Sequence, residues 1–174
     1  MRTRSLIVAA AAELLSLGIA LPASADTTTA SVTVTGGTLT ISAPAAAGSL
    51  GSIANSVSGG TINGSLGQVQ VNDARSAAAG SGWVASVIST AFTPSAGPTI
   101  AASAVSYSAG AITKTGTATY TANDPTNLTG VSAAVTATGI TGDNSATWNP
   151  TIHVAVAGGT IATTYSAIIT HSVV

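Results

Sequence analysis

The segment "SVTVTGGTLTIS", residues 31–42, carries the pattern that decides the fold. Its apolar side chains alternate with Thr and Ser, and they are Val32, Val34, Leu39 and Ile41. Alternation with period two is typical of half-buried β-strands, and β-branched residues suit a pleated surface. The segment therefore predicts two short strands, 30–35 and 38–42, with a turn at Gly36-Gly37 between them.

The same alternation recurs along the rest of the chain. Further strands are predicted at 66–72, 83–90, 100–108, 116–122, 131–138, 150–157 and 163–173. Clusters of Gly, Pro, Asn and Asp separate them, and the Gly-, Ser- and Ala-rich stretch 44–64 predicts a long loop with at most one short edge strand. Many short strands with regular turn signals predict an all-β fold, either an antiparallel β-sandwich or a barrel-like arrangement.

The first 25 residues have the features of a secretory signal peptide. Arg2 and Arg4 precede an apolar run, and "LPASAD" then presents small residues at Ala23 and Ala25. This order predicts cleavage after Ala25. Residues 26–174 are then the mature protein, which is expected outside the cell as one β-sandwich domain without an integral membrane segment.

Charge is scarce in the mature part of the chain. Residues 26–174 hold two basic residues against four aspartates, a formal net charge of −2. Phosphate backbones are bound by clustered Lys and Arg, so nucleic acid is not an expected partner. The chain has no cysteine, which means that no disulfide can stabilise it and no modified cysteine can anchor it.

The segment "LGQVQVNDARSAAAGSGWVASVISTAF", residues 66–92, resembles the central part of the WxL-domain cell-surface proteins of Gram-positive bacteria. In that family a strand ends in a Val-x-Asp-x-Arg pattern, a glycine-containing loop follows, and Gly-Trp opens the next strand. The matching residues here are Val71, Asp73, Arg75, Gly82, Trp83 and Phe92.

The C-terminus resembles the second signature of the same family. Tyr165, Ile169 and Thr170 match it, while His171 stands where the family has Trp and Val173 where it has Leu. The resemblance implies a secreted protein that attaches non-covalently to the cell wall, with peptidoglycan as ligand. A secretion signal without a covalent anchor agrees with this implication.

The two tryptophans and Arg75 are the candidate ligand-binding residues. The strand pattern puts Trp83 on one face with Ala85 and Val87, which favours a core position over a sugar-stacking platform. Trp148 fits a core cap and an exposed platform equally well. Asp73 and Arg75, two apart on a strand, predict a structural ion pair, with contact between Arg75 and an anionic ligand as the alternative.

Neither catalysis nor a bound metal is expected. Glycoside hydrolysis needs two carboxyl groups flanking one bond, and the few aspartates all lie beside turn residues or Arg75. Two histidines without cysteines or clustered carboxylates make a poor metal site, and no cofactor motif occurs.

Two functions follow from the sequence. The first is a secreted, non-enzymatic cell-surface protein that associates non-covalently with the Gram-positive cell wall. The alternative is a structural module that pairs with other envelope proteins, or with itself, through the exposed edges of its sheets, because long and nearly uncharged strands favour edge pairing.

Overall fold

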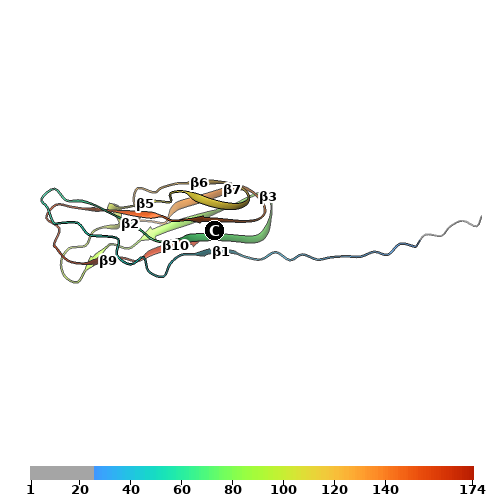
Figure 1. The fold of residues 1–174 in the computed structure, drawn as a ribbon, viewed down its shortest axis with the longest axis horizontal. Helices are drawn as coiled ribbons and strands as arrows, with labels where there is room; N and C mark the ends of the chain where they lie inside the picture. Colours follow the sequence, from blue (N-terminus) through green and yellow to red (C-terminus); the bar gives the residue numbers. More distant parts are fainter. Residues whose placement is uncertain (1–25) are drawn as a thin grey trace, which may run out of the picture. The chain divides into compact units, whose positions relative to one another are not determined.

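The computed structural model describes residues 26–174, and the predicted signal peptide lies outside them. The strands are β1 (Leu39–Ser42), β2 (Gly60–Ser65), β3 (Val69–Ser89), β4 (Thr93–Pro94), β5 (Val105–Ser108), β6 (Ile112–Ala122), β7 (Ser132–Trp148), β8 (Thr151–Val156), β9 (Tyr165–Ser166) and β10 (Ile169–Val173). A 3-10 turn, η1 (Ala102–Ala104), precedes β5. The predicted all-β antiparallel sandwich is confirmed (Figure 1).

The largest sheet has the order β1-β3-β7-β6, and β10 pairs with β3 on the same side as β1. A three-stranded sheet, β2-β8-β5, and the two-stranded β4-β9 complete the fold. All of these pairs are antiparallel. The short edge strand expected within residues 44–64 is therefore β2.

Three strands of the largest sheet bend at the same level. The pairing register of β3 with β7 shifts between Asp73 and Trp83, and that of β6 with β7 shifts between Thr115 and Thr119. Glycines such as Gly116 and Gly142 have positive φ at these bends, a backbone conformation that would be strained for a residue with a side chain. Figure 1 shows β3 curving round at one end, so that its two halves belong to two layers of the sandwich.

Two predicted breaks in the strands are wrong. Residues 80–82, in the expected break between strands 66–72 and 83–90, and residues 142–144, in the expected break between strands 131–138 and 150–157, lie within β3 and β7. Clusters of Gly, Ser and Asn occur in β-bulges as well as in turns. The local sequence therefore does not distinguish one bent strand from two strands joined by a turn. The predicted strands 66–72 and 83–90 are consequently one strand.

The predicted strand 30–35 is also absent. Residues 26–38 form no strand, and Val32 and Val34 are 91% and 84% exposed. Neither Gly36 nor Gly37 has the positive φ that a two-residue hairpin requires. The compact unit that contains all the strands spans Thr35–Val174.

The two glycines have a different role, which is close backbone contact. A Cβ on Gly36 would lie 2.7 Å from the carbonyl oxygen of Arg75, and one on Gly37 would lie 2.9 Å from the Cβ of Ala74. The amide of Gly37 donates to the carbonyl of Ala74. The chain therefore enters β1 directly alongside β3, at the bend.

The core is built from one face of each strand. In the second half of β3 the burial pattern alternates, with Trp83, Ala85 and Val87 at most 2% exposed. The apolar faces of β5, β7 and β8 supply most of the rest of the core. Because the core has few large side chains, each aromatic ring makes a large part of the packing.

Candidate functional site

Trp83 is a core residue, as predicted, and a hydrogen-bond donor as well. Its indole Nε1 donates to Oδ1 of Asn144 at 2.9 Å, and its ring lies 5.7 Å from the ring of Tyr120. At 2% exposure the indole offers no free face for a sugar ring. The interpretation of Trp83 as a ligand platform is therefore not supported by the geometry.

Asp73 and Arg75 form the predicted ion pair, which belongs to the same cluster. Nε and Nη2 of Arg75 donate to the two carboxylate oxygens of Asp73 at 2.8 and 3.0 Å, and Nη2 also donates to the carbonyl of Gly82 at 3.2 Å. Asp73 is completely buried, and the Arg75 side chain is 37% exposed. Two of the guanidinium nitrogens of Arg75 are thus already engaged within the fold.

Asn144 connects this ion pair to Trp83. Its Nδ2 donates to Oδ2 of Asp73 at 3.1 Å, while its Oδ1 accepts from Trp83 and, at 3.3 Å, from the hydroxyl of Tyr120. Asp73 and Asn144 face each other across β3 and β7 on one side of the bend, whereas Trp83 lies on the other. We call these five residues, Asp73, Arg75, Trp83, Tyr120 and Asn144, the corner network.

The electrostatics of the corner network favour an ionised carboxylate. The hydrogen bond from Arg75 lowers the pKa of Asp73, and the hydrogen bond from Asn144 lowers it further, against the opposing effect of burial. The same pair raises the pKa of Arg75. Buried polar groups that satisfy one another in this way fix a unique geometry, and the network therefore has a structural role.

Trp148 is likewise buried, at 2% exposure, so the structure places it in the core and not on the surface. Its Nε1 donates to the hydroxyl of Tyr107 at 2.7 Å. Burial raises the pKa of Tyr107, which keeps the phenol neutral. Trp148 and Trp83 thus each have their polar nitrogen satisfied inside the sandwich.

The remaining motif residues lie around two adjoining recesses at the surface. The first, of about 500 Å³, is lined by the loop 48–56 and by residues 160–166, and we call it the loop recess. The second, of about 570 Å³, is lined by residues that follow β1 and by β9 and β10, and we call it the edge groove. Phe92 and Tyr165 line both.

The C-terminal signature contributes mainly to the edge groove. Ile169, Thr170 and His171 line it, whereas Val173 packs against the core outside it. The ring of His171 lies 5.8 Å from that of Tyr107, and burial lowers the pKa of His171. Its Nε2 is buried without a hydrogen-bond partner in the described part of the chain.

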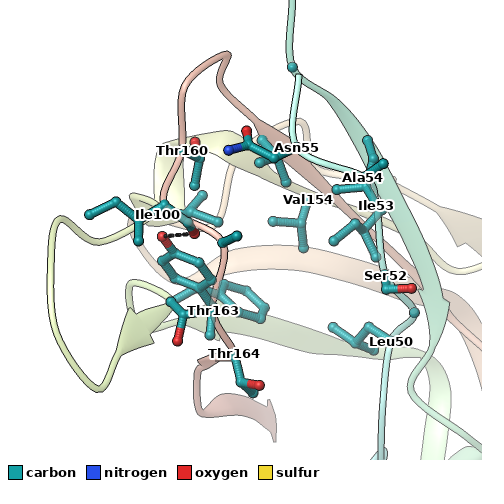
Figure 2. Close-up of a pocket in the computed structure, with 18 of the residues that line it drawn as sticks. Leu50, Ser52, Ile53, Ala54, Asn55, Ile100, Val154, Thr160, Thr163 and Thr164 are labelled. Atoms are coloured by element: carbon teal, nitrogen blue, oxygen red, sulfur yellow. Dashed lines mark hydrogen bonds between the residues drawn. The ribbon is translucent and has the colours of Figure 1, made fainter. Parts of the chain in front are cut away.

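The loop recess combines an apolar interior with a polar rim. Figure 2 shows Ile53, Ile100 and Val154 projecting into it, with Asn55 and Thr160 near each other at one end. Thr163 and Thr164 lie at the other end (Figure 2). The hydroxyl of Tyr165 donates to the carbonyl of Ile161 at 3.0 Å, which fixes the aromatic ring in the recess wall.

No charged side chain is among the described residues that line either recess. The chemistry available there is hydrogen bonding by hydroxyl, amide and backbone groups over apolar surface, which suits a neutral ligand. Within residues 26–174 no three His, Cys, Asp or Glu side chains gather as metal ligands would. Over the same residues, no helix is long and apolar enough to cross a bilayer.

Sequence reasoning missed several contributors to these sites. Asn144 is 61 residues from Trp83 and carried no signal of its own beyond a turn-like neighbourhood. The loop 48–56, which forms one wall of the loop recess, appeared only as a Gly- and Ser-rich stretch. Both become recognisable only when the fold brings distant segments together.

Comparison with protein-family models, with curated proteins and with solved structures finds no match to this chain. The resemblance to WxL domains therefore rests on the residues quoted above. The residues of the first signature are, however, close together in this fold. Asp73, Arg75, Gly82 and Trp83 are brought together at the bend of β3.

Proposed function

We propose that this protein is exported and non-catalytic, and that it associates non-covalently with the cell wall through neutral glycan contacts. The observation that carries the proposal is the uncharged loop recess, about 500 Å³ in volume, with a polar rim of Asn and Thr over an apolar interior. Sugar rings present hydroxyl groups and apolar CH faces together, and a lining of this kind is complementary to both.

Tyr165 supports this location for the glycan contact. It belongs to the C-terminal signature of the WxL resemblance, which implies peptidoglycan as ligand, and its half-buried ring lines the recess. Because the indoles of Trp83 and Trp148 are buried, Tyr165 is the candidate aromatic contact in their place. Arg75 is left out of the proposed contact because its guanidinium binds Asp73.

Co-sedimentation with purified cell-wall sacculi tests the proposal. The secreted protein is expected in the pellet, and the double substitution Asn55→Ala with Thr163→Ala is expected to weaken retention about tenfold, the effect of losing one or two hydrogen bonds. Asn123→Ala serves as the matched control, because Asn123 is exposed and lies outside the recess. Wild-type protein that stays in the supernatant at low and moderate salt overturns the proposal.

Salt dependence supplies a second measurement. Interactions between exposed charges are screened over about 10 Å at 0.1 M salt, whereas neutral hydrogen bonds are not. Because the recess lacks charged side chains, we expect the same retention on sacculi at about 0.05 M and about 0.5 M sodium chloride. Release by the higher salt would show an ionic attachment and contradict a glycan contact in this recess.

A further inference from the structure

The molecule has an unpaired segment and an open groove at a sheet edge, and the two complement each other. One is residues 28–35, a segment whose sequence alternates like that of a strand, with Ala30, Val32 and Val34 at alternate positions and no pairing partner in the described part of the chain. The other is the edge groove, an opening between β1 and β10 that is lined mostly by apolar side chains and also exposes polar backbone and hydroxyl groups. An unpaired strand and an open sheet edge are the two components of β-strand addition.

The edge groove has free backbone on both of its borders. In residues 26–174, β1 and β10 each pair only with β3, so each keeps one unpaired side. Leu66, Phe92 and Ile169 line the opening between these edges, and Ile168 at its border is 70% exposed. The unpartnered Nε2 of His171 also lies in this lining, as a polar atom that an added backbone or hydroxyl group can satisfy.

We propose that residues 28–35 of one copy of this chain insert into the edge groove of a second copy. Val32 and Val34 enter the groove, the Thr side chains on the opposite face stay in solvent, and the backbone pairs with the free side of β1 or β10. This contact is heterologous, so its repetition generates a ring if the rotation between copies closes and an open chain of copies if it does not. Neither the segment nor the groove carries a charge that would oppose contact between identical molecules.

Insertion into the same molecule is disfavoured by the path of the chain. The hydrogen bond between Gly37 and Ala74 fixes the start of β1 at the bend of β3. The groove is lined by residues that follow β1, such as Ala43 and Ala47, at the opposite end of that strand. A return along β1 through a two-residue turn at Gly36-Gly37 would need positive φ there, and neither glycine has it.

The proposal is independent of wall association, and it gives the edge-pairing alternative a specific form. Light scattering on the chain from Asp26 onward, over rising concentration, tests it first. We expect oligomers that fall to the mass of one chain when residues 27–34 are deleted. The compact unit Thr35–Val174 contains every strand, so this deletion leaves the fold intact.

Charge placed on each face of the segment provides the matched control. Val32→Asp with Val34→Asp is expected to give monomers, whereas Ser31→Asp with Thr33→Asp, which adds the same charge to the solvent face, is expected to leave the oligomers in place. A wild-type chain that is monomeric at all concentrations overturns the proposal. So do oligomers that survive the two valine substitutions.

Engineered cysteines locate the acceptor, because the natural chain has none. Val34→Cys with Ala46→Cys, one in the segment and one in the groove, is expected to form disulfide-linked ladders under oxidation that collapse on reduction. Val34→Cys with Thr113→Cys, which puts the second cysteine on β6, is expected to form none. Intramolecular crosslinks, or equal ladders from both pairs, contradict insertion between copies. Sacculus binding by the valine variant then reports on wall association separately.

Discussion

At the scale of single residues, Asn144 connects three other side chains of the corner network. One amide group accepts from Trp83 and Tyr120 and donates to Asp73. Removing it leaves the buried Nε1 of Trp83 without a partner, at about 1–3 kcal/mol, and takes one of two hydrogen bonds each from Oδ2 of Asp73 and the hydroxyl of Tyr120. Asn144→Ala is expected to lower the free energy of unfolding by about 2–4 kcal/mol in urea denaturation. Asn123→Ala, at an exposed position, is the control, and equal losses in the two variants would contradict a role for the network.

Substitutions at Trp83 separate packing from hydrogen bonding. Trp83→Ala removes both, and we expect a loss of about 3–5 kcal/mol, as for other large core side chains. Trp83→Phe keeps most of the ring but removes the Nε1 donor to Asn144, so a smaller loss of about 1–3 kcal/mol is expected. Unfolding midpoints measured for both variants check this order, and an unchanged midpoint in Trp83→Ala would contradict a core role.

Acid should weaken the fold through Asp73. The pKa of Asp73 is lowered in the folded protein, mainly by the hydrogen bond from Arg75. Its stabilising contribution is therefore complete above the unfolded-state pKa, about 3.9, and is lost as the pH falls through the folded-state value. The stability difference between wild type and Asp73→Asn should be largest near neutral pH and should shrink below about pH 4. Urea denaturation at several pH values measures it, and a difference that stays constant down to pH 2 would contradict the linkage.

At the scale of elements, the bend of β3 depends on close contact between backbones. A Cβ on Gly82 would lie 2.7 Å from the carbonyl oxygen of Ala137, which belongs to the adjacent strand β7. Gly82→Ala is expected to destabilise the protein by about 1–3 kcal/mol, because the backbone has to shift. Gly130→Ala is the matched control: nothing lies within 4 Å of a Cβ there, and φ is not positive. Thermal unfolding of the two variants should separate them, and equal midpoints would contradict the packing argument.

The sequence predicted the faces of the strands better than their ends. Alternation identified the strand at β1 and placed Trp83, Ala85 and Val87 together, because a period of two follows directly from strand geometry. It failed at 80–82 and 142–144, where turn-forming residues occupy bends within strands. It also predicted a strand at 30–35, since the pattern reports strand propensity and not the presence of a partner strand.

The candidate site was predictable only in part. The Asp73–Arg75 pair was expected because both residues lie two apart on one strand, and the ion pair confirms it. The contacts of Trp83 and Trp148 depend on Asn144 and Tyr107, which lie 61 and 41 residues away, and no local pattern indicates them. The loop recess combines segments more than 100 residues apart, so it follows from topology and not from any one motif.

At the scale of the whole molecule, β3, β6 and β7 each run through the bend and contribute to both layers. Neither layer can lose these strands without disrupting the other. The compact unit Thr35–Val174 should therefore unfold in one cooperative transition although the chain has no disulfide.

The bend also determines how the fold would respond to mechanical load. The first residue paired to β3, Gly37, lies beside Ala74, and the last, Val174, exchanges hydrogen bonds with Val84, so both attachments are at the bend. A pulling force applied at these two points would peel β1 and β10 from β3 one hydrogen bond at a time. Strands that are peeled resist less force than strands that are sheared, because their hydrogen bonds break in sequence and not together. Under tension between its ends, this protein would give way at β1 and β10 while the corner network still held the bent strands.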